Sequence, residues 1–169
     1  MTPDLDRIIA GLSEAQTRFY IDCEFDGHNG ALLSIALVKD DGDGIHIKTT
    51  APITDDWVRT NILPIMDSHK APKSASVGQH DVGGVIRAFI GDCGCPVIVA
   101  DSPVDIGRFC RALSTGSDGQ WASADYHLMQ FEVHNVDCYP TSLPDAVQHN
   151  AWWDAMALRQ RLQEMNDAS

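Results

Sequence analysis

Hydrophobic positions along the chain change their spacing near residue 18. Before it, Leu5, Ile8 and Ile9 recur at helical spacing, which predicts a short helix over residues 4–16. From Arg18 onward apolar side chains alternate with polar ones, and this alternation predicts a strand with one buried face. The apolar members of the alternation are Phe19, Ile21, Cys23 and Phe25.

Two further strands follow without a helix between them. Residues 31–39 form a largely apolar run and residues 45–50 a shorter one. Glycine-containing segments at 27–30 and 40–44 separate the runs, which predicts turns between three antiparallel strands. The segment 40–44 also resembles the start of a calcium loop, but Ala51 stands where such a loop needs its final Glu.

Helical patterns dominate the next part of the chain. One helix is predicted over about 56–65, ended by Pro64, and another over about 77–90. Ser76 and Gln79 have the spacing of a capping box at the start of the second helix.

A polar loop is predicted between these two helices, at residues 68–76. It carries Lys70 and Lys73. Solvated lysines are the commoner case in such a loop, and contact with phosphate groups is the alternative.

The last third of the chain alternates between strand and helix patterns. A continuous apolar run at 96–100 predicts a buried strand, and Ser102-Pro103 opens a helix after it. Residues 127–133 predict a final strand and residues 150–165 a final helix. The inward face of that helix is predicted to carry Ala151, Ala155, Leu158, Leu162 and Met165.

The resulting order of elements, β-β-β-α-α-β-α-β-α, is that of the ribonuclease H-like fold. We therefore predict an α/β domain with a mixed five-stranded sheet, three antiparallel strands plus a parallel strand, flanked by helices. Residues 18–169 would form this domain, and residues 1–17 a helical extension.

Charge and cysteine content limit the possible partners and compartments. The formal net charge of −12 argues against a broad basic surface for duplex DNA, so a polyanionic substrate would need bound divalent ions. No apolar stretch is long enough for a transmembrane helix and no secretion signal is recognisable, which predicts a cytoplasmic protein without membrane contact. The five cysteines are scattered, and Cys93-Gly-Cys95 lacks the second ligand pair of a structural zinc site.

Asp22 and Glu24 lie two residues apart on the polar face of the first predicted strand. Both carboxylates therefore point to the same side. Neighbouring carboxylates repel one another unless protons or cations intervene, and hard oxygen ligands suit Mg²⁺ or Mn²⁺. A solvated edge strand is the alternative, because Tyr20 and Asp26 share this face.

A third acid follows the buried strand at 96–100. Asp105 falls in the first turn of the next helix, where acids also serve as ordinary caps. A carboxyl group beyond the carboxyl end of a buried strand is also where sites form in open α/β sheets. We favour Asp105, and Asp101 on the same segment is the rival.

His149 and Asp154 stand at the start of the last predicted helix. On one continuous helix, five residues would separate them by about 140°, too far apart for a shared site. Asn150 is a suitable cap, so we predict that the helix begins there. His149 would then lie in the preceding loop and could approach the site.

Taken together, these residues resemble the three motifs of the DEDDh 3′→5′ exonucleases in order and spacing. The motifs are Asp22-Cys-Glu24, an acid opening a helix after a buried strand, and His149-Asn-Ala-Trp-Trp-Asp154-Ala. The last matches His-x-Ala-x-x-Asp fully, whereas the segment around Asp105 reads Asp-Ser-Pro-Val-Asp. Within the superfamily the chain is most similar to a small bacterial and phage group related to a mycobacterial polyadenylate-specific exoribonuclease, and the likeness covers about residues 18–161.

The resemblance implies a reaction and a set of ligands. Asp22, Glu24, Asp105 and Asp154 would hold two Mg²⁺ or Mn²⁺ ions, and His149 would act as general base. Single-stranded RNA would be shortened from its 3′ end, with release of nucleoside 5′-monophosphates. Phe25 would stack on the terminal base, although a core position on the apolar face is an equal alternative.

Other interpretations stay open. The same fold could degrade DNA, or form a catalytically silent module that binds nucleic acid or a partner protein; the intact ligand positions argue against the silent module. A hydrolase using Ser, His and Asp ranks below these, since no Gly-x-Ser-x-Gly segment is present. Trp152 and Trp153 are adjacent on one helix, so one is expected at an interface or near substrate. The family resemblance implies a homodimer.

Overall fold

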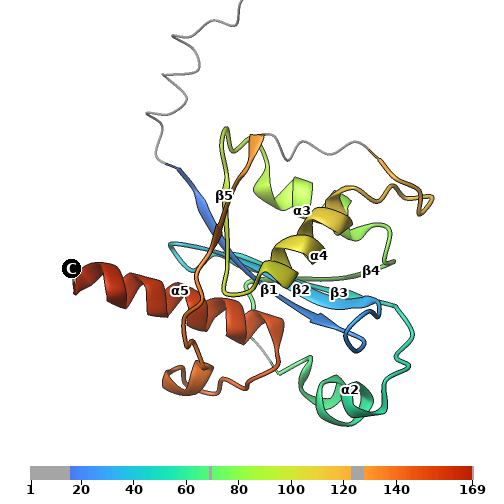
Figure 1. The fold of residues 1–169 in the computed structure, drawn as a ribbon, viewed down its shortest axis with the longest axis horizontal. Helices are drawn as coiled ribbons and strands as arrows, with labels where there is room; N and C mark the ends of the chain where they lie inside the picture. Colours follow the sequence, from blue (N-terminus) through green and yellow to red (C-terminus); the bar gives the residue numbers. More distant parts are fainter. Residues whose placement is uncertain (1–15, 69, 123–127, 169) are drawn as a thin grey trace, which may run out of the picture.

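Figure 1 shows the computed structural model of the chain, an α/β fold in which one mixed sheet carries helices on both faces. The structure describes residues 16–68, 70–122 and 128–168. Nearly all of the helix predicted over residues 4–16 therefore lies outside the described residues.

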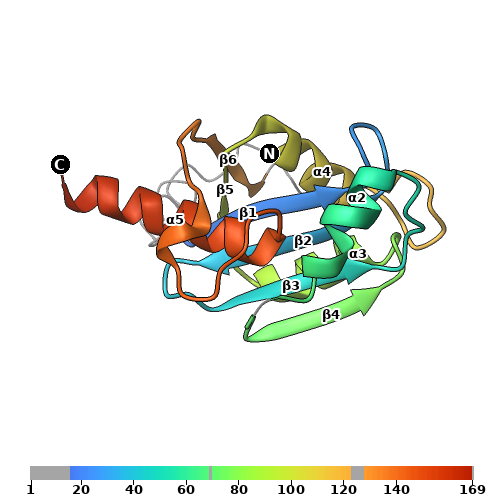
Figure 2. The ribbon, with the colours of Figure 1, turned by 90° about the horizontal axis from the view of Figure 1, so that it is seen from below.

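Six strands form the sheet, in the order β4-β3-β2-β1-β5-β6 (Figure 2). As predicted, β1, β2 and β3 pair antiparallel, and β5 runs parallel to β1. The two edge strands are also parallel to their neighbours, β4 to β3 and β6 to β5. The strands are β1 Arg18–Phe25, β2 Leu32–Lys39, β3 Gly44–Thr49, β4 Lys73–Val77, β5 Val97–Ala100 and β6 Gln130–Val133.

The helices divide between the two faces of the sheet. Helices α3 and α4 lie on one face, and α2 and α5 on the other (Figures 1 and 2). The helix predicted over residues 56–65 is split into two pieces, because Pro64 lies in a separate 3₁₀ turn. The described helices are α2 Asp56–Asn61, η1 Leu63–Ile65, α3 Val82–Ile90, α4 Pro103–Leu113, η3 Pro140–Ser142 and α5 Ala151–Asp167.

The alternation predicted for β1 is confirmed, but Tyr20 on the face predicted to be polar is also buried, so the side chains divide between two cores. Phe19, Ile21 and Cys23 pack with residues of α3 and α4. Tyr20 points to the opposite face and packs with α5. Because each fully buried side chain of this size contributes about 1.5–3 kcal/mol, a register slip of one residue would be costly. Asp22 and Glu24 are therefore held on the α5 side of the sheet.

The prediction of five strands is wrong, because β4 adds a sixth at the sheet edge. Residues 73–77 were expected to end a polar loop and start a helix, but they pair in parallel with β3. The helix begins only at Val82, after Asp81, so Ser76 and Gln79 form no capping box. Polar side chains on an edge strand face solvent, and this segment consequently lacked an apolar alternation.

Trp152 and Trp153 are both buried, which corrects the prediction that one of them would face outward. Trp152 lies over Gly44, where an added Cβ would come within 2.7 Å of the indole ring. The indole nitrogen of Trp153 donates a hydrogen bond to the carbonyl of Ser68. Helix α5 is thus covered by the sheet on one side and by loops on another, so adjacent positions are both enclosed.

Helix α5 extends beyond the sheet at its carboxyl end (Figures 1 and 2). Its last buried side chain is Leu162, and Met165 is 42% exposed, contrary to the predicted inward face. The helical pattern was correct, but the sheet ends before the helix does. No helix in the described residues is long and apolar enough to cross a bilayer.

Candidate metal centre

The pairing of β1 with β5 places two acids side by side. Tyr20 pairs with Val99 in a parallel register. Continuing that register by two residues brings Asp22 opposite Asp101, just after β5 ends at Ala100. Asp101, the alternative to Asp105 in the sequence, therefore lies beside the first candidate ligand.

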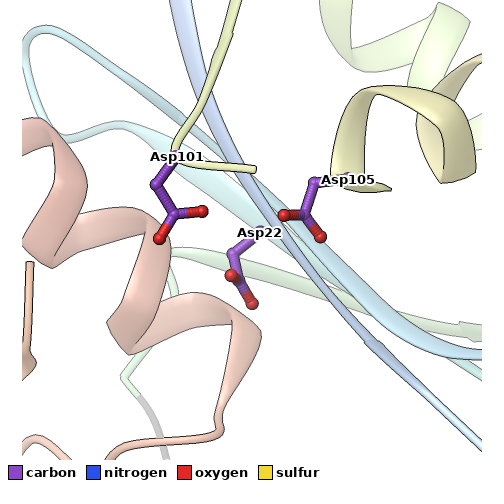
Figure 3. A group of neighbouring side chains, drawn as sticks. All are labelled: Asp22, Asp101 and Asp105. Atoms are coloured by element: carbon purple, nitrogen blue, oxygen red, sulfur yellow. The ribbon is translucent and has the colours of Figure 1, made fainter. Parts of the chain in front are cut away.

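Asp105 approaches the same place from the first turn of α4. Ser102 caps this helix, as its side chain accepts a hydrogen bond from the N–H of Val104. One carboxylate oxygen from each of Asp22, Asp101 and Asp105 lies within 4.8 Å of the other two. Figure 3 shows Asp22 between the other two side chains, with all three carboxylates directed toward a common space.

A second group of carboxylates shares Asp22 with the first. One oxygen from each of Asp22, Glu24 and Asp154 lies within 4.8 Å of the other two. Asp154 comes from the first turn of α5. The structure thus brings together all four predicted ligands and adds Asp101 to them.

Helix α5 begins where the sequence predicted. Asn150 is its N-cap, and the side chain of Asn150 accepts a hydrogen bond from the N–H of Trp152. His149 precedes the helix, is exposed, and has a left-handed backbone with φ of 60°. The left-handed residue turns the chain into the helix, so His149 and Asp154 can serve one site despite their spacing.

Burial makes these carboxyl groups weaker acids than they would be in water. Desolvation, together with the charges of Asp154 and Asp105, raises the pKa of Glu24 to about 8. Desolvation also raises the pKa of Asp105 and that of Asp154 to about 7, in each case with a contribution from the charge of Asp101. The pKa of Asp22 is raised as well, first by burial and then by the charge of Asp105. A divalent cation would stabilise the charged forms that the protein alone disfavours.

The acids line an open cleft with a volume of about 580 Å³. Among the described residues around it there is no lysine or arginine to neutralise the carboxylates. The donor set therefore fits hard divalent cations such as Mg²⁺ or Mn²⁺, which take oxygen ligands. Besides the five acids, the lining includes Cys23, Phe25, His28, Asp55, Trp57, Ser102, Val104 and His149.

Trp57 also lines the cleft and was not predicted as a site residue. Its ring is 55% exposed and meets the His149 ring edge to face, with 5.8 Å between centroids. A large apolar side chain at an outward position of a short helix was the available signal.

Asp26 holds Trp57 in place through the preceding loop. Its carboxylate accepts hydrogen bonds from the N–H and hydroxyl of Thr54 and from the N–H of Asp55. These bonds hold the pKa of Asp26 below its usual value. Asp55 in turn caps α2 by accepting from the N–H of Val58. Asp26 was expected on the polar face of the first strand, but it lies after β1 and its carboxylate is occupied by this loop.

Phe25 and the two loop lysines have defined surroundings. Phe25 is partly buried against the core and also borders the cleft, and the Arg108 guanidinium lies 4.5 Å from its ring centroid. Lys70 pairs with Asp145, and Lys73 with Asp43, both in exposed positions. The ligand groups found among the described residues contain only carboxylates, so Cys93 and Cys95 form no metal cluster there.

No model of a known protein family matches this chain, and no curated protein matches it either.

Proposed function

We propose that this protein is a two-metal-dependent 3′→5′ exoribonuclease that releases nucleoside 5′-monophosphates from single-stranded 3′ ends. The observation that carries the proposal is the sharing of Asp22 by two groups of three carboxylates. In a two-metal site Asp22 would contribute a carboxylate to both ions. Glu24 and Asp154 would complete one site, and Asp101 and Asp105 the other.

The arrangement of the sheet supports the same proposal. The order β3-β2-β1-β5-β6, with three antiparallel strands beside parallel ones, agrees with a ribonuclease H-like fold. In that fold the acids would come from the central strand and from helices that start near its carboxyl half. The motif resemblance of Asp22, Glu24, His149 and Asp154 points to the DEDDh type.

The bound ions would supply Lewis acidity toward the phosphate and would lower the pKa of the attacking water. His149 would accept the proton of that water, since its exposed ring borders the cleft. The water oxygen attacks phosphorus, and the bond from phosphorus to the 3′ oxygen of the preceding nucleotide breaks. That oxygen takes up a proton and remains on the shortened strand.

Aromatic side chains would hold the terminal nucleotide. Trp57 and Phe25 both border the cleft, and base stacking on such rings contributes about 1–3 kcal/mol per base. Because stacking depends little on base identity, these contacts favour a single-stranded end without selecting its sequence.

The test compares the wild type with Asp22→Asn on 5′-labelled and 3′-labelled single-stranded RNA and DNA, with Mg²⁺ or Mn²⁺. Asp167→Asn, at the exposed far end of α5, is the matched control. We expect the wild type and the control to shorten 5′-labelled RNA stepwise and to release labelled monophosphate from the 3′ label. Asp22→Asn should be inactive.

Each other outcome has a clear meaning. Internal cleavage, or equal activity of the wild type and Asp22→Asn, would overturn the proposal. Faster stepwise degradation of DNA than of RNA would assign the first alternative, an exodeoxyribonuclease. Absence of both hydrolysis and Asp22-dependent Mn²⁺ uptake in calorimetry would assign the second, a catalytically silent module.

A further inference from the structure

A second cavity, of about 330 Å³, lies on the other side of the turn that follows β1. Among the described residues that line it, none is acidic. This is unexpected in a chain with a formal charge of −12. Its lining consists of Asn29, Gly30, Ala31, Leu32, Gln79, His80, Arg108, Arg111, Ala112, Thr115 and Gly119.

Arg111 gives this cavity an uncompensated positive charge. Its side chain is exposed, and within the described part of the chain it has no hydrogen bond or ion pair. Most other described cations face a carboxylate within ion-pair distance. Arg87 on α3, Arg108 on α4 and Arg159 on α5 donate only to backbone carbonyls. Two of the described arginines that face no carboxylate, Arg108 and Arg111, therefore line this cavity.

Arg108 forms the wall between the cavity and the metal cleft. Its guanidinium donates to the carbonyl of Gly30, which borders the cavity, and to that of His28, which borders the cleft. It also covers the ring of Phe25 on the cleft side. The cavity and the metal cleft are therefore neighbours, and the side chain of Arg108 separates them.

Helix α4 sets the distance between Asp105 and Arg111. Asp105, Arg108 and Arg111 follow one another at intervals of three residues. Six residues of helix rise about 9 Å, and stacked nucleotides rise about 3.4 Å each. A strand that ran along α4 would therefore place a phosphate near Arg111 two to three nucleotides from one held beside Asp105.

We propose that this cavity binds the backbone phosphates of the substrate strand, two to three nucleotides upstream of the bond that is cut, through Arg111 with His80 beside it. The inference rests on the proposed function and extends it, because it assigns a minimum length to a well-bound substrate. A dinucleotide would fill only the metal cleft. A strand of four or more nucleotides would reach Arg111 as well.

The experiment measures steady-state kinetics of the wild type, Arg111→Gln and Arg111→Lys on single-stranded RNA of two and of ten nucleotides. Arg161→Gln is the matched control, an exposed arginine on α5. For Arg111→Gln we expect KM for the ten-nucleotide strand to rise about tenfold, with kcat and the dinucleotide KM unchanged. Arg111→Lys should recover most of the loss. The slope of log affinity against log salt should fall by about 0.7, the value for one phosphate contact on a single strand.

An unchanged KM for the longer strand in Arg111→Gln, or the same change in Arg161→Gln, would overturn the inference and leave the nuclease proposal standing. An equal rise of KM for both lengths would also overturn it, because the effect would then not depend on reach. Failure of the wild type to hydrolyse either strand would overturn the proposed function, and this inference with it.

Discussion

The backbone N–H of Asn150 donates a hydrogen bond to the carboxylate of Asp154, with 3.0 Å between the nitrogen and Oδ2. The side-chain amide of the same asparagine donates to the carbonyls of Ile65 and Met66, at 2.7 and 3.2 Å. Its oxygen also caps α5. Asn150 therefore caps α5 and orients the carboxylate of Asp154. It also ties the start of α5 to the carbonyls of Ile65 and Met66.

Replacement of Asn150 by Ala should destabilise the protein. Loss of the cap costs about 0.5–2 kcal/mol. The carbonyls of Ile65 and Met66 would also lose their hydrogen-bond donor, which adds to that cost because Asn150 is buried. We expect urea unfolding to show a loss of about 2–3 kcal/mol. Asn166→Ala, near the exposed end of α5, should change stability by less than about 0.5 kcal/mol. Equal midpoints for the two variants would mean that Asn150 does not hold the helix start.

His149 offers a way to separate catalysis from folding. Its left-handed backbone is one that asparagine also tolerates, so His149→Asn should fold with an unchanged melting temperature. Loss of a general base should lower kcat about 10²–10⁴-fold while Mn²⁺ uptake in calorimetry is retained. Asp167→Asn, at the exposed far end of α5, serves as control. Retention of full kcat in His149→Asn would remove this histidine from the proposed mechanism.

Much of the site could be predicted because it depends on local rules. The alternation in β1 fixed the side to which Asp22 and Glu24 point, and a good cap at Asn150 fixed the start of α5. Both are decided within a few residues of the chain. Local sequence was therefore sufficient to place His149 before the helix that carries Asp154.

The features that escaped prediction depend on distant parts of the chain. Asp101 joins the acids because β5 pairs in register with β1, and no pattern near residue 101 reports that register. Strand β4 exists because the edge of β3 accepts a partner, although its own side chains are mostly polar. The burial of Trp153 depends on the carbonyl of Ser68, 85 residues earlier in the chain.

The shared position of Asp22 predicts how many ions each variant binds. Asp22 belongs to both carboxylate groups, whereas Glu24 belongs to one and Asp105 to the other. Calorimetry with Mn²⁺ should therefore give two ions for the wild type and one each for Glu24→Gln and Asp105→Asn. Asp22→Asn should bind neither tightly. Loss of a single ion in all three variants would contradict the bridging role of Asp22.

The pH dependence of stability should report the same acids in the metal-free protein. The pKa of Glu24 is raised to about 8, and those of Asp105 and Asp154 to about 7, by burial first. Unfolded carboxyl groups have pKa values of about 4. Between these values the folded protein holds protons that the unfolded chain has released. Stability from these groups is therefore complete below about pH 4 and is lost as the pH rises to about 8.

Thermal unfolding in EDTA should accordingly show a melting temperature that falls from pH 5 to pH 9, and Asp22→Asn should flatten the curve by removing one of the repelling charges. Asp26 and Glu132 cannot produce this trend, because their pKa values are lowered and their contribution is lost only in acid. Mn²⁺ binds the charged carboxylates, so its stabilising effect should grow over the same interval in which the metal-free protein weakens. A melting temperature in EDTA that rises with pH across this interval would mean that the acids do not repel one another as their burial requires.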